Sequence, residues 1–123
     1  MKLICTLLVA ASVGLLASAT ASSSQSTSPP KLIGTVGPGF TISLKRNGQI
    51  VKTLKAGMYT LVVFDKASIH NFNIEGTGLD KAVTTPGFVG TKTVIIRIRA
   101  GKRVKYYCAP HESTMFGYVK VTA

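Results

Sequence analysis

Hydrophobic and polar residues alternate along most of the chain after Lys31, with the period of two that is typical of β-strands. The clearest example carries Val94, Ile96 and Ile98 on one face and two arginines on the other. No stretch shows a sustained helical period. The strands that this pattern predicts are Phe40–Leu44, Gln49–Leu54, Met58–Phe64, Ile69–Ile74, Thr91–Arg99, Lys102–Cys108 and Phe116–Thr122.

The segments between these strands carry residues that favour turns. Asn47-Gly48 predicts a tight hairpin turn, and Gly101 predicts another before the strand that ends in Cys108. The one long connection, Asp80–Gly90, has room for a helical turn. Short strands at this spacing, joined by glycine-bearing turns, predict an all-β domain built as a sandwich or a barrel.

The first 21 residues follow a different pattern. Met1-Lys2 is followed by a mainly apolar run, Leu3–Ala17, and then by Ala19-Thr20-Ala21, which is the order of a secretory signal peptide. We therefore expect cleavage after Ala21 and a secreted or periplasmic protein. The run is shorter than the roughly 18–20 apolar residues that a membrane-spanning helix needs, so an uncleaved N-terminal anchor is the less favoured alternative.

Three parts of the chain follow from these patterns. Residues 1–21 form the signal peptide, and residues 22–30 (SSSQSTSPP) form a polar, flexible spacer that has nothing to bury. Residues 31–123 form one β domain. The mature chain would have 102 residues, which allows one small sandwich and leaves no room for a second domain.

Processing would also remove Cys5 and leave Cys108 as the only cysteine of an exported chain, where an unpaired thiol is unusual. Cys108 begins the pattern C-x2-H-x3-M, which continues with His111 and Met115 in a loop between two predicted strands. The other histidine, His70, lies 37 intervening residues upstream, in a predicted strand and on the face turned toward the core.

The donor types in this set suit copper in both of its oxidation states. Two imidazoles and a thiolate, with a weak axial thioether, form the ligand set of blue-copper electron-transfer sites. The sequence therefore predicts one copper ion per chain, bound by His70, Cys108, His111 and Met115. Zinc is less favoured, because structural zinc sites normally use four Cys or His ligands and a thioether is a poor zinc donor.

A cysteine nucleophile with His111 as its base would be a different class of site. No Asn or Asp is evidently placed to orient that base, and the carboxylates are scattered rather than paired: Asp65, Glu75, Asp80 and Glu112. We therefore expect a protein that is not an enzyme.

The segment from Leu54 to the C-terminus resembles a small secreted cupredoxin of the plastocyanin and azurin group. The matching motifs are His70-Asn71-Phe72, Cys108-Ala109-Pro110-His111 and the closing strand Gly117–Val121. The resemblance implies a Greek-key β-sandwich of about seven or eight strands, copper at the four residues named above, and one-electron transfer. It also implies that Asn71 ties the His70 strand to the cysteine loop and that electrons pass at the edge of His111.

One departure from plastocyanins is the spacing of the last two ligands. Three residues separate His111 from Met115, where plastocyanins usually have four. Two functions use the same four ligands: carrying single electrons between redox partners as a type 1 copper protein, and scavenging or delivering copper. Ligand identity does not separate them. In either case we expect a monomer, with no membrane span in the mature chain.

The charge of the chain bears on its partners. It has 15 Lys and Arg against 4 Asp and Glu, a formal charge of +11 that becomes +10 without Lys2. Export, and the lack of aromatic residues interleaved with the cations, argue against nucleic acid. We expect the basic residues to steer an acidic redox partner or to hold the protein near an anionic envelope surface, with a role in solubility alone as the alternative; examples are Arg97, Arg99 and Lys102.

Overall fold

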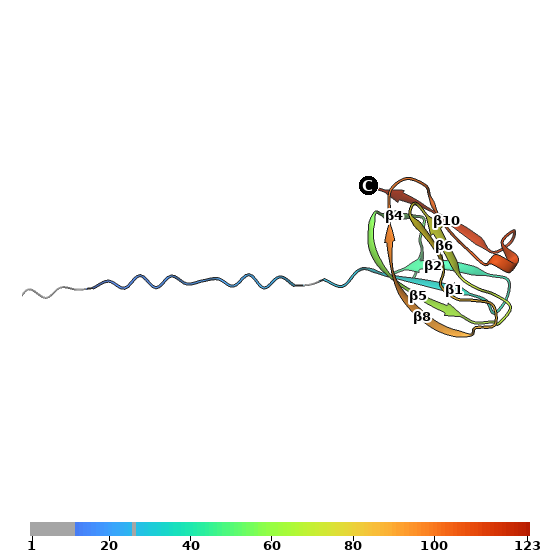
Figure 1. Cartoon of the computed structure of the whole chain (residues 1–123), viewed down its shortest axis with the longest axis horizontal. Helices are drawn as coiled ribbons and strands as arrows, with labels where there is room; N and C mark the ends of the chain where they lie inside the picture. Colours follow the sequence, from blue (N-terminus) through green and yellow to red (C-terminus); the bar gives the residue numbers. More distant parts are fainter. Residues whose placement is uncertain (1–11, 26) are drawn as a thin grey trace, which may run out of the picture.

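The computed structural model describes residues 12–25 and 27–123, and from Lys31 onward these fold into a sandwich of two five-stranded sheets (Figure 1). Sheet A has the strand order β3-β2-β1-β5-β8, and sheet B has the order β4-β10-β9-β6-β7. The strands are β1 (Lys31–Val36), β2 (Ile42–Arg46), β3 (Gln49–Ile50), β4 (Thr53–Lys55), β5 (Gly57–Asp65), β6 (Asn73–Gly76), β7 (Leu79–Ala82), β8 (Gly90–Ile98), β9 (Val104–Tyr107) and β10 (Phe116–Thr122).

The all-β Greek-key sandwich that the sequence predicts is confirmed. The chain passes repeatedly from one sheet to the other, for example between β5 and β6 and between β8 and β9. Most neighbouring strands are antiparallel, but β1 runs parallel to β5 and β4 runs parallel to β10. Both parallel pairs join strands that lie far apart in the sequence, which follows from the crossings between sheets.

The described residues form ten strands rather than about seven or eight. Part of the difference lies in the segment predicted as one strand, Gln49–Leu54, which changes sheet at Val51-Lys52. Its first part is β3, paired with β2, and its second part is β4, paired with β10 in the other sheet. The sequence pattern is the same in either sheet, so the change of sheet is not visible in it.

Strand β1 (Lys31–Val36) is a second part, because no strand was predicted there. The remaining difference lies in the connection Asp80–Gly90, where a helical turn was predicted as an option. Its first residues instead belong to β7, which pairs with β6 through the tight turn at Thr77-Gly78. Residues 83–89 contain turns and no helix. The helical segment of the described chain is a single short 3₁₀ turn, η1 (Ala109–His111).

The prediction of a strand over Ile69–Ile74 was wrong in its bounds, because β6 begins only at Asn73. The backbone before it has other partners: Phe72 N–H donates to Thr84 Oγ1 at 2.9 Å, and Phe72 C=O accepts from Val83 N–H at 2.8 Å. His70 therefore lies in a loop rather than in a strand. It is nevertheless fully buried, as the sequence predicts.

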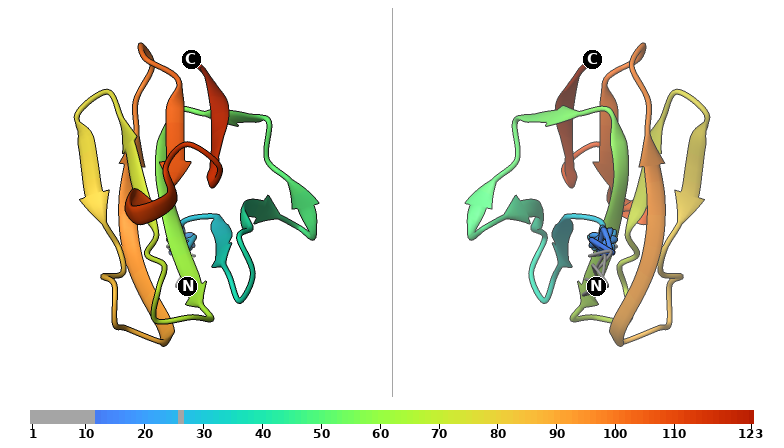
Figure 2. Two further views of the ribbon diagram at one scale, coloured as in Figure 1. Left: turned by 90° about the vertical axis from the view of Figure 1, so that its right-hand side faces the viewer. Right: turned by 90° about the vertical axis from the view of Figure 1, so that its left-hand side faces the viewer.

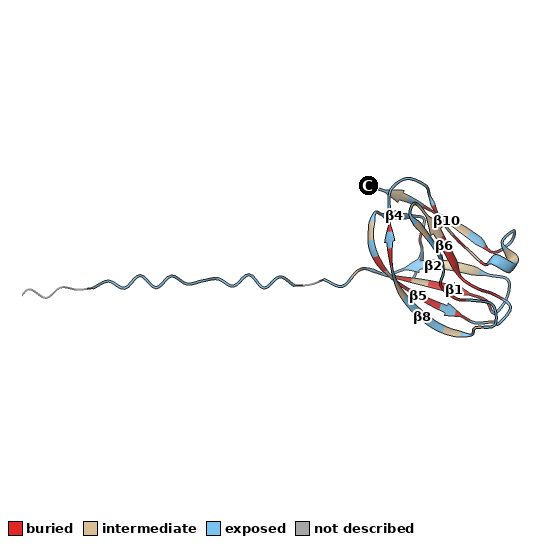
Figure 3. Cartoon of the chain, viewed as in Figure 1, coloured by how far each residue is buried: buried red, intermediate tan, exposed pale blue. Residues whose placement is uncertain are grey.

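The core lies between the two sheets and consists of buried residues from the strands of both, which are red in Figure 3. Ile96 and Ile98 of β8 are buried while Arg97 is exposed, so the alternation predicted for this strand is confirmed. Fully burying one such aliphatic side chain contributes about 1.5–3 kcal/mol. Across the core, the rings of Phe72 and Tyr106 stack with their centroids 6.1 Å apart. This packing fixes the segment that leads from His70 into β6 against β9, which ends beside Cys108.

The described residues before Lys31 form no helix or strand, and nearly all of them are exposed. In Figure 1 this segment leaves the sandwich on the side opposite η1. No helix among the described residues is long and apolar enough to cross a membrane. Most of the predicted signal peptide, including Cys5, lies outside the described residues.

Candidate metal centre

Three connections between strands meet at the end of the sandwich that carries η1, and Figure 2 (left) looks onto this end. The connection from β9 to β10 contributes Cys108, His111 and Met115. The crossover from β5 to β6 contributes His70, and the connection from β1 to β2 contributes Phe40. Residues from both sheets thus form one site.

The donor atoms of two histidines and the cysteine face one another. The Nδ1 atoms of His70 and His111 lie 3.1 Å apart, and Cys108 Sγ lies 3.7 Å from the first and 3.6 Å from the second. In the plane of these three atoms, the point equidistant from them is about 2.0 Å from each, close to the usual length of a metal–imidazole bond and slightly less than that of a metal–thiolate bond. The arrangement fits a single metal ion.

A hydrogen bond between the two imidazoles would also explain the 3.1 Å contact. It would not explain why the thiol lies at nearly the same distance from both nitrogens. Cys108 and His70 are fully buried and His111 is half-buried, so the three donors converge in an almost dry space. Two imidazoles and one thiolate are donor types that suit copper in both of its oxidation states.

Met115, the fourth predicted ligand, is held in the same loop by its backbone. Cys108 N–H donates to Met115 C=O at 3.0 Å, and Met115 N–H donates to His111 C=O at 2.8 Å. Its side chain is buried. His111 N–H donates to Cys108 C=O at 3.1 Å within η1, where Pro110 restricts the backbone. These bonds close a short loop and fix the relative positions of its three donor residues.

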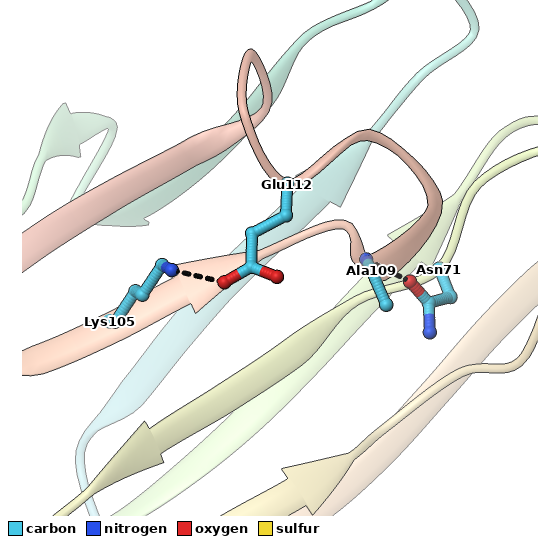
Figure 4. Close-up of polar contacts among 4 residues, drawn as sticks. All are labelled: Asn71, Lys105, Ala109 and Glu112. Atoms are coloured by element: carbon cyan, nitrogen blue, oxygen red, sulfur yellow. Dashed lines mark hydrogen bonds and ion pairs between the residues drawn. The ribbon is translucent and has the colours of Figure 1, made fainter.

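The tie expected at Asn71 is confirmed (Figure 4). Asn71 Oδ1 accepts a 2.8 Å hydrogen bond from Ala109 N–H and a 3.1 Å bond from Asn73 Nδ2. The backbone N–H of Asn71 points at Cys108 Sγ, 3.5 Å away. One buried residue therefore joins the His70 loop to the cysteine loop and offers a donor to the sulfur.

We expect the substitution Asn71→Ala to destabilise the metal-free protein by about 1–3 kcal/mol, because it leaves the Ala109 N–H without its partner next to the core. Urea unfolding followed by circular dichroism measures the change. Thr114→Ala is the matched control, since Thr114 Oγ1 also makes a loop hydrogen bond, to His111 C=O, but in an exposed position. Equal losses in the two variants would contradict the proposed tie.

The surroundings of His111 do not resemble those of a catalytic base. Among the described residues no carboxylate or amide side chain makes a hydrogen bond with its ring. The nearest carboxylate in the sequence, Glu112, instead pairs with Lys105 at 2.5 Å (Figure 4). The hydrogen bond from Lys105 to Glu112 raises the pKa of Lys105. The described residues therefore supply no hydrogen-bonded carboxylate or amide that would orient His111 as a base.

Sequence reasoning missed Phe40. Its ring lies edge-on to both imidazoles, with centroids 5.4 Å from His70 and 4.9 Å from His111. Nothing in the spacing of residues links Phe40 to the histidines, since it comes from a different connection on the other sheet. The only feature of the sequence that could have drawn attention to Phe40 is its place directly after the turn residues Gly37-Pro38-Gly39.

Comparison with solved structures identifies the fold. Reduced rusticyanin matches with a TM-score of 0.54 and 20% identity, over 75% of this chain and 78% of that one. Auracyanin A, a "blue" copper protein from the green thermophilic photosynthetic bacterium Chloroflexus aurantiacus, matches with a TM-score of 0.53 and 16% identity, over 77% of this chain and 100% of that one. No family model and no curated protein sequence matches.

Proposed function

From its cupredoxin fold and its convergent histidine and cysteine side chains, we propose that this protein is a type 1 copper protein that carries single electrons. The observation that carries the proposal is the triangle of His70 Nδ1, His111 Nδ1 and Cys108 Sγ, which fits one ion. Met115 would supply the weak axial donor. Copper bound there would supply a one-electron couple between its two oxidation states.

The residues around the triangle favour transfer without rearrangement. Cys108 follows directly on β9, and its N–H is bonded to the residue that begins the return to β10. Asn71 fixes the His70 loop to the same segment. Because these ties do not involve the metal, they would hold the donors in similar positions in both oxidation states. His111 is half-buried, whereas His70 and Cys108 are fully buried, so a partner would exchange electrons through His111.

Cyclic voltammetry of the copper-loaded full chain tests this function. We expect a reversible one-electron wave, and fast electron self-exchange measured by NMR line broadening. Copper delivery uses the same ligands and is the alternative outcome: an irreversible wave, together with rapid passage of Cu(I) to a competing chelator, would favour it over electron transfer.

We also propose that the basic residues orient the protein on an anionic envelope surface. Arg97 and Arg99 lie at the end of β8, and Lys102 lies in the turn before β9, whereas Cys108 follows the opposite end of β9. These cations are therefore far from the edge of His111. All three are exposed, and none of them takes part in the ion pair found among the described residues, which joins Lys105 to Glu112. The segment before β1 leaves the sandwich at this same end, away from η1 (Figure 1).

We expect the double charge reversal Arg99→Glu with Lys102→Glu to weaken binding of the full chain to vesicles of phosphatidylcholine with phosphatidylglycerol by about 30-fold or more at low salt, at about 1 kcal/mol per lost cation. Vesicle co-sedimentation measures it. The matched control, Lys66→Glu with Lys92→Glu, changes charge equally near the metal end of β5 and β8. A larger loss in the control pair would instead favour an acidic partner that docks at the metal end.

Export by a cleavable signal peptide is part of the same proposal. An unpaired cysteine is unusual in an oxidising compartment. Binding of the Cys108 thiolate to the metal would explain why the exported chain has one. Mass spectrometry of the protein from its own cells should find Ser22 as the first residue. An intact N-terminus would favour the uncleaved anchor.

A further inference from the structure

Phe40 lies against both histidines on the side of the site that belongs to sheet A. Its ring makes interplanar angles of 78° with His70 and 86° with His111, at centroid distances of 5.4 Å and 4.9 Å. These are edge-to-face contacts in the range that stabilises aromatic pairs. Yet the residue is 63% exposed, so it is not part of the core. One side of the ring covers the histidines and the rest faces solvent.

The loop that carries Phe40 is fixed in place by its own contacts. Gly37 N–H donates to Thr41 C=O at 2.9 Å, which closes the loop. Gly37 has φ of 73°, and a Cβ at this position would lie 2.9 Å from Cδ2 of His70. The absence of a side chain at Gly37 therefore lets the loop approach the histidine closely. The position of Phe40 follows from this approach.

Residues from three connections surround the site, and Phe40 is the one that comes from the β1–β2 connection. The β9–β10 connection surrounds Cys108 on the side of sheet B, and Asn71 closes the side toward β6. The phenyl ring of Phe40 lies edge-on to both imidazoles, whose Nδ1 atoms lie 3.6–3.7 Å from the sulfur.

We propose that Phe40 is a lid over this site, which keeps small ligands and thiol reagents away from Cys108 and the inner edges of the histidines. Only one part of this proposal, the shielding of bound copper, depends on the proposed function. The shielding of Cys108 is a property of the protein without metal, so the two are tested separately.

The first test is the alkylation of Cys108 in the metal-free full chain by iodoacetamide. The thiolate sulfur forms a bond to the methylene carbon and iodide leaves. Loss of the ring in Phe40→Ala removes both edge-to-face contacts, and we expect the reaction to be about tenfold faster. Peptide mass spectrometry follows Cys108 separately from Cys5, which serves as an internal reference in each sample.

Two further variants keep this test decisive. Phe40→Leu retains an apolar side chain over the histidines and should stay within about threefold of the wild-type rate. Phe64→Ala truncates another exposed phenylalanine, on the outer face of β5, and should leave the rate unchanged. Equal rates in the wild-type protein and Phe40→Ala would overturn the lid. Equal acceleration in Phe40→Ala and Phe64→Ala would do the same, since it would indicate general loosening.

The second test uses the copper-loaded protein and an added anion, azide. We expect azide to change the visible spectrum of Phe40→Ala at concentrations about tenfold below those needed for the wild-type protein. If copper does not bind at all, the proposed function fails while the alkylation result still stands. If copper binds and azide acts equally on both proteins, the function stands and the lid toward copper is overturned.

Discussion

Adding one equivalent of Cu(II) to this protein should produce an intense visible absorption band, and Cys108→Ser should abolish it. The band arises from charge transfer between a thiolate and Cu(II), and Cys108 is the only cysteine among the described residues, with its sulfur 3.6–3.7 Å from both histidine nitrogens. A serine hydroxyl has no comparable low-energy transition. Absorption spectroscopy during a copper titration measures the band and its saturation at one ion per chain.

Cys5→Ser is the matched control for this substitution, because it removes the other thiol of the chain. The control should be as intensely coloured as the parent protein. A colourless complex of one copper per chain would refute the type 1 site itself. A Cys108→Ser variant as blue as the parent would remove Cys108 from the ligand set.

The second large effect concerns Met115, the proposed axial ligand. Met115→Leu should keep copper bound and raise the reduction potential by about 60 mV or more, roughly a tenfold change in the equilibrium constant for one electron. Leucine fills a similar buried volume, so the loop should keep its shape. Loss of the thioether would leave the more highly charged Cu(II) state with one donor fewer in a buried site, which would favour Cu(I). Cyclic voltammetry measures the shift.

Met58→Leu provides the control, since Met58 is exposed on β5 and carries the same chemical change away from the site. Its potential should equal that of the parent. Complete loss of copper from Met115→Leu would mean that the axial bond is not weak in this protein. An unchanged potential would mean that Met115 is not a ligand.

The strands that could be predicted from the sequence are those whose surroundings follow the simple rule of one buried and one exposed face. In β8, Ile96 and Ile98 face the core and Arg97 faces solvent, and β10 has the predicted bounds, Phe116–Thr122. The segment Ile69–Ile74 does not follow this rule, and only its last two residues belong to a strand. Asn71 and Asn73 are buried beside the apolar residues, because their amides bond to the cysteine loop and to each other.

The candidate site divides in the same way. Cys108, His111 and Met115 stand within eight residues, so local chain geometry alone brings them into one turn, and their spacing was visible in the sequence. His70 could be proposed as a ligand from its residue type and the family resemblance. Its distance to the other donors could not, because it depends on how the β5–β6 crossover packs against the β9–β10 connection.

By itself the sequence determined the class of the fold, the donor set and the metal that this set prefers, since alternation and ligand chemistry are local properties of residues. The tertiary structure alone decided which atoms of the histidines face the sulfur, that Phe40 covers them, and that Arg99 and Lys102 lie at the far end from Cys108. These features join segments that lie far apart in the chain, and only the packing of one sheet on the other sets their distances.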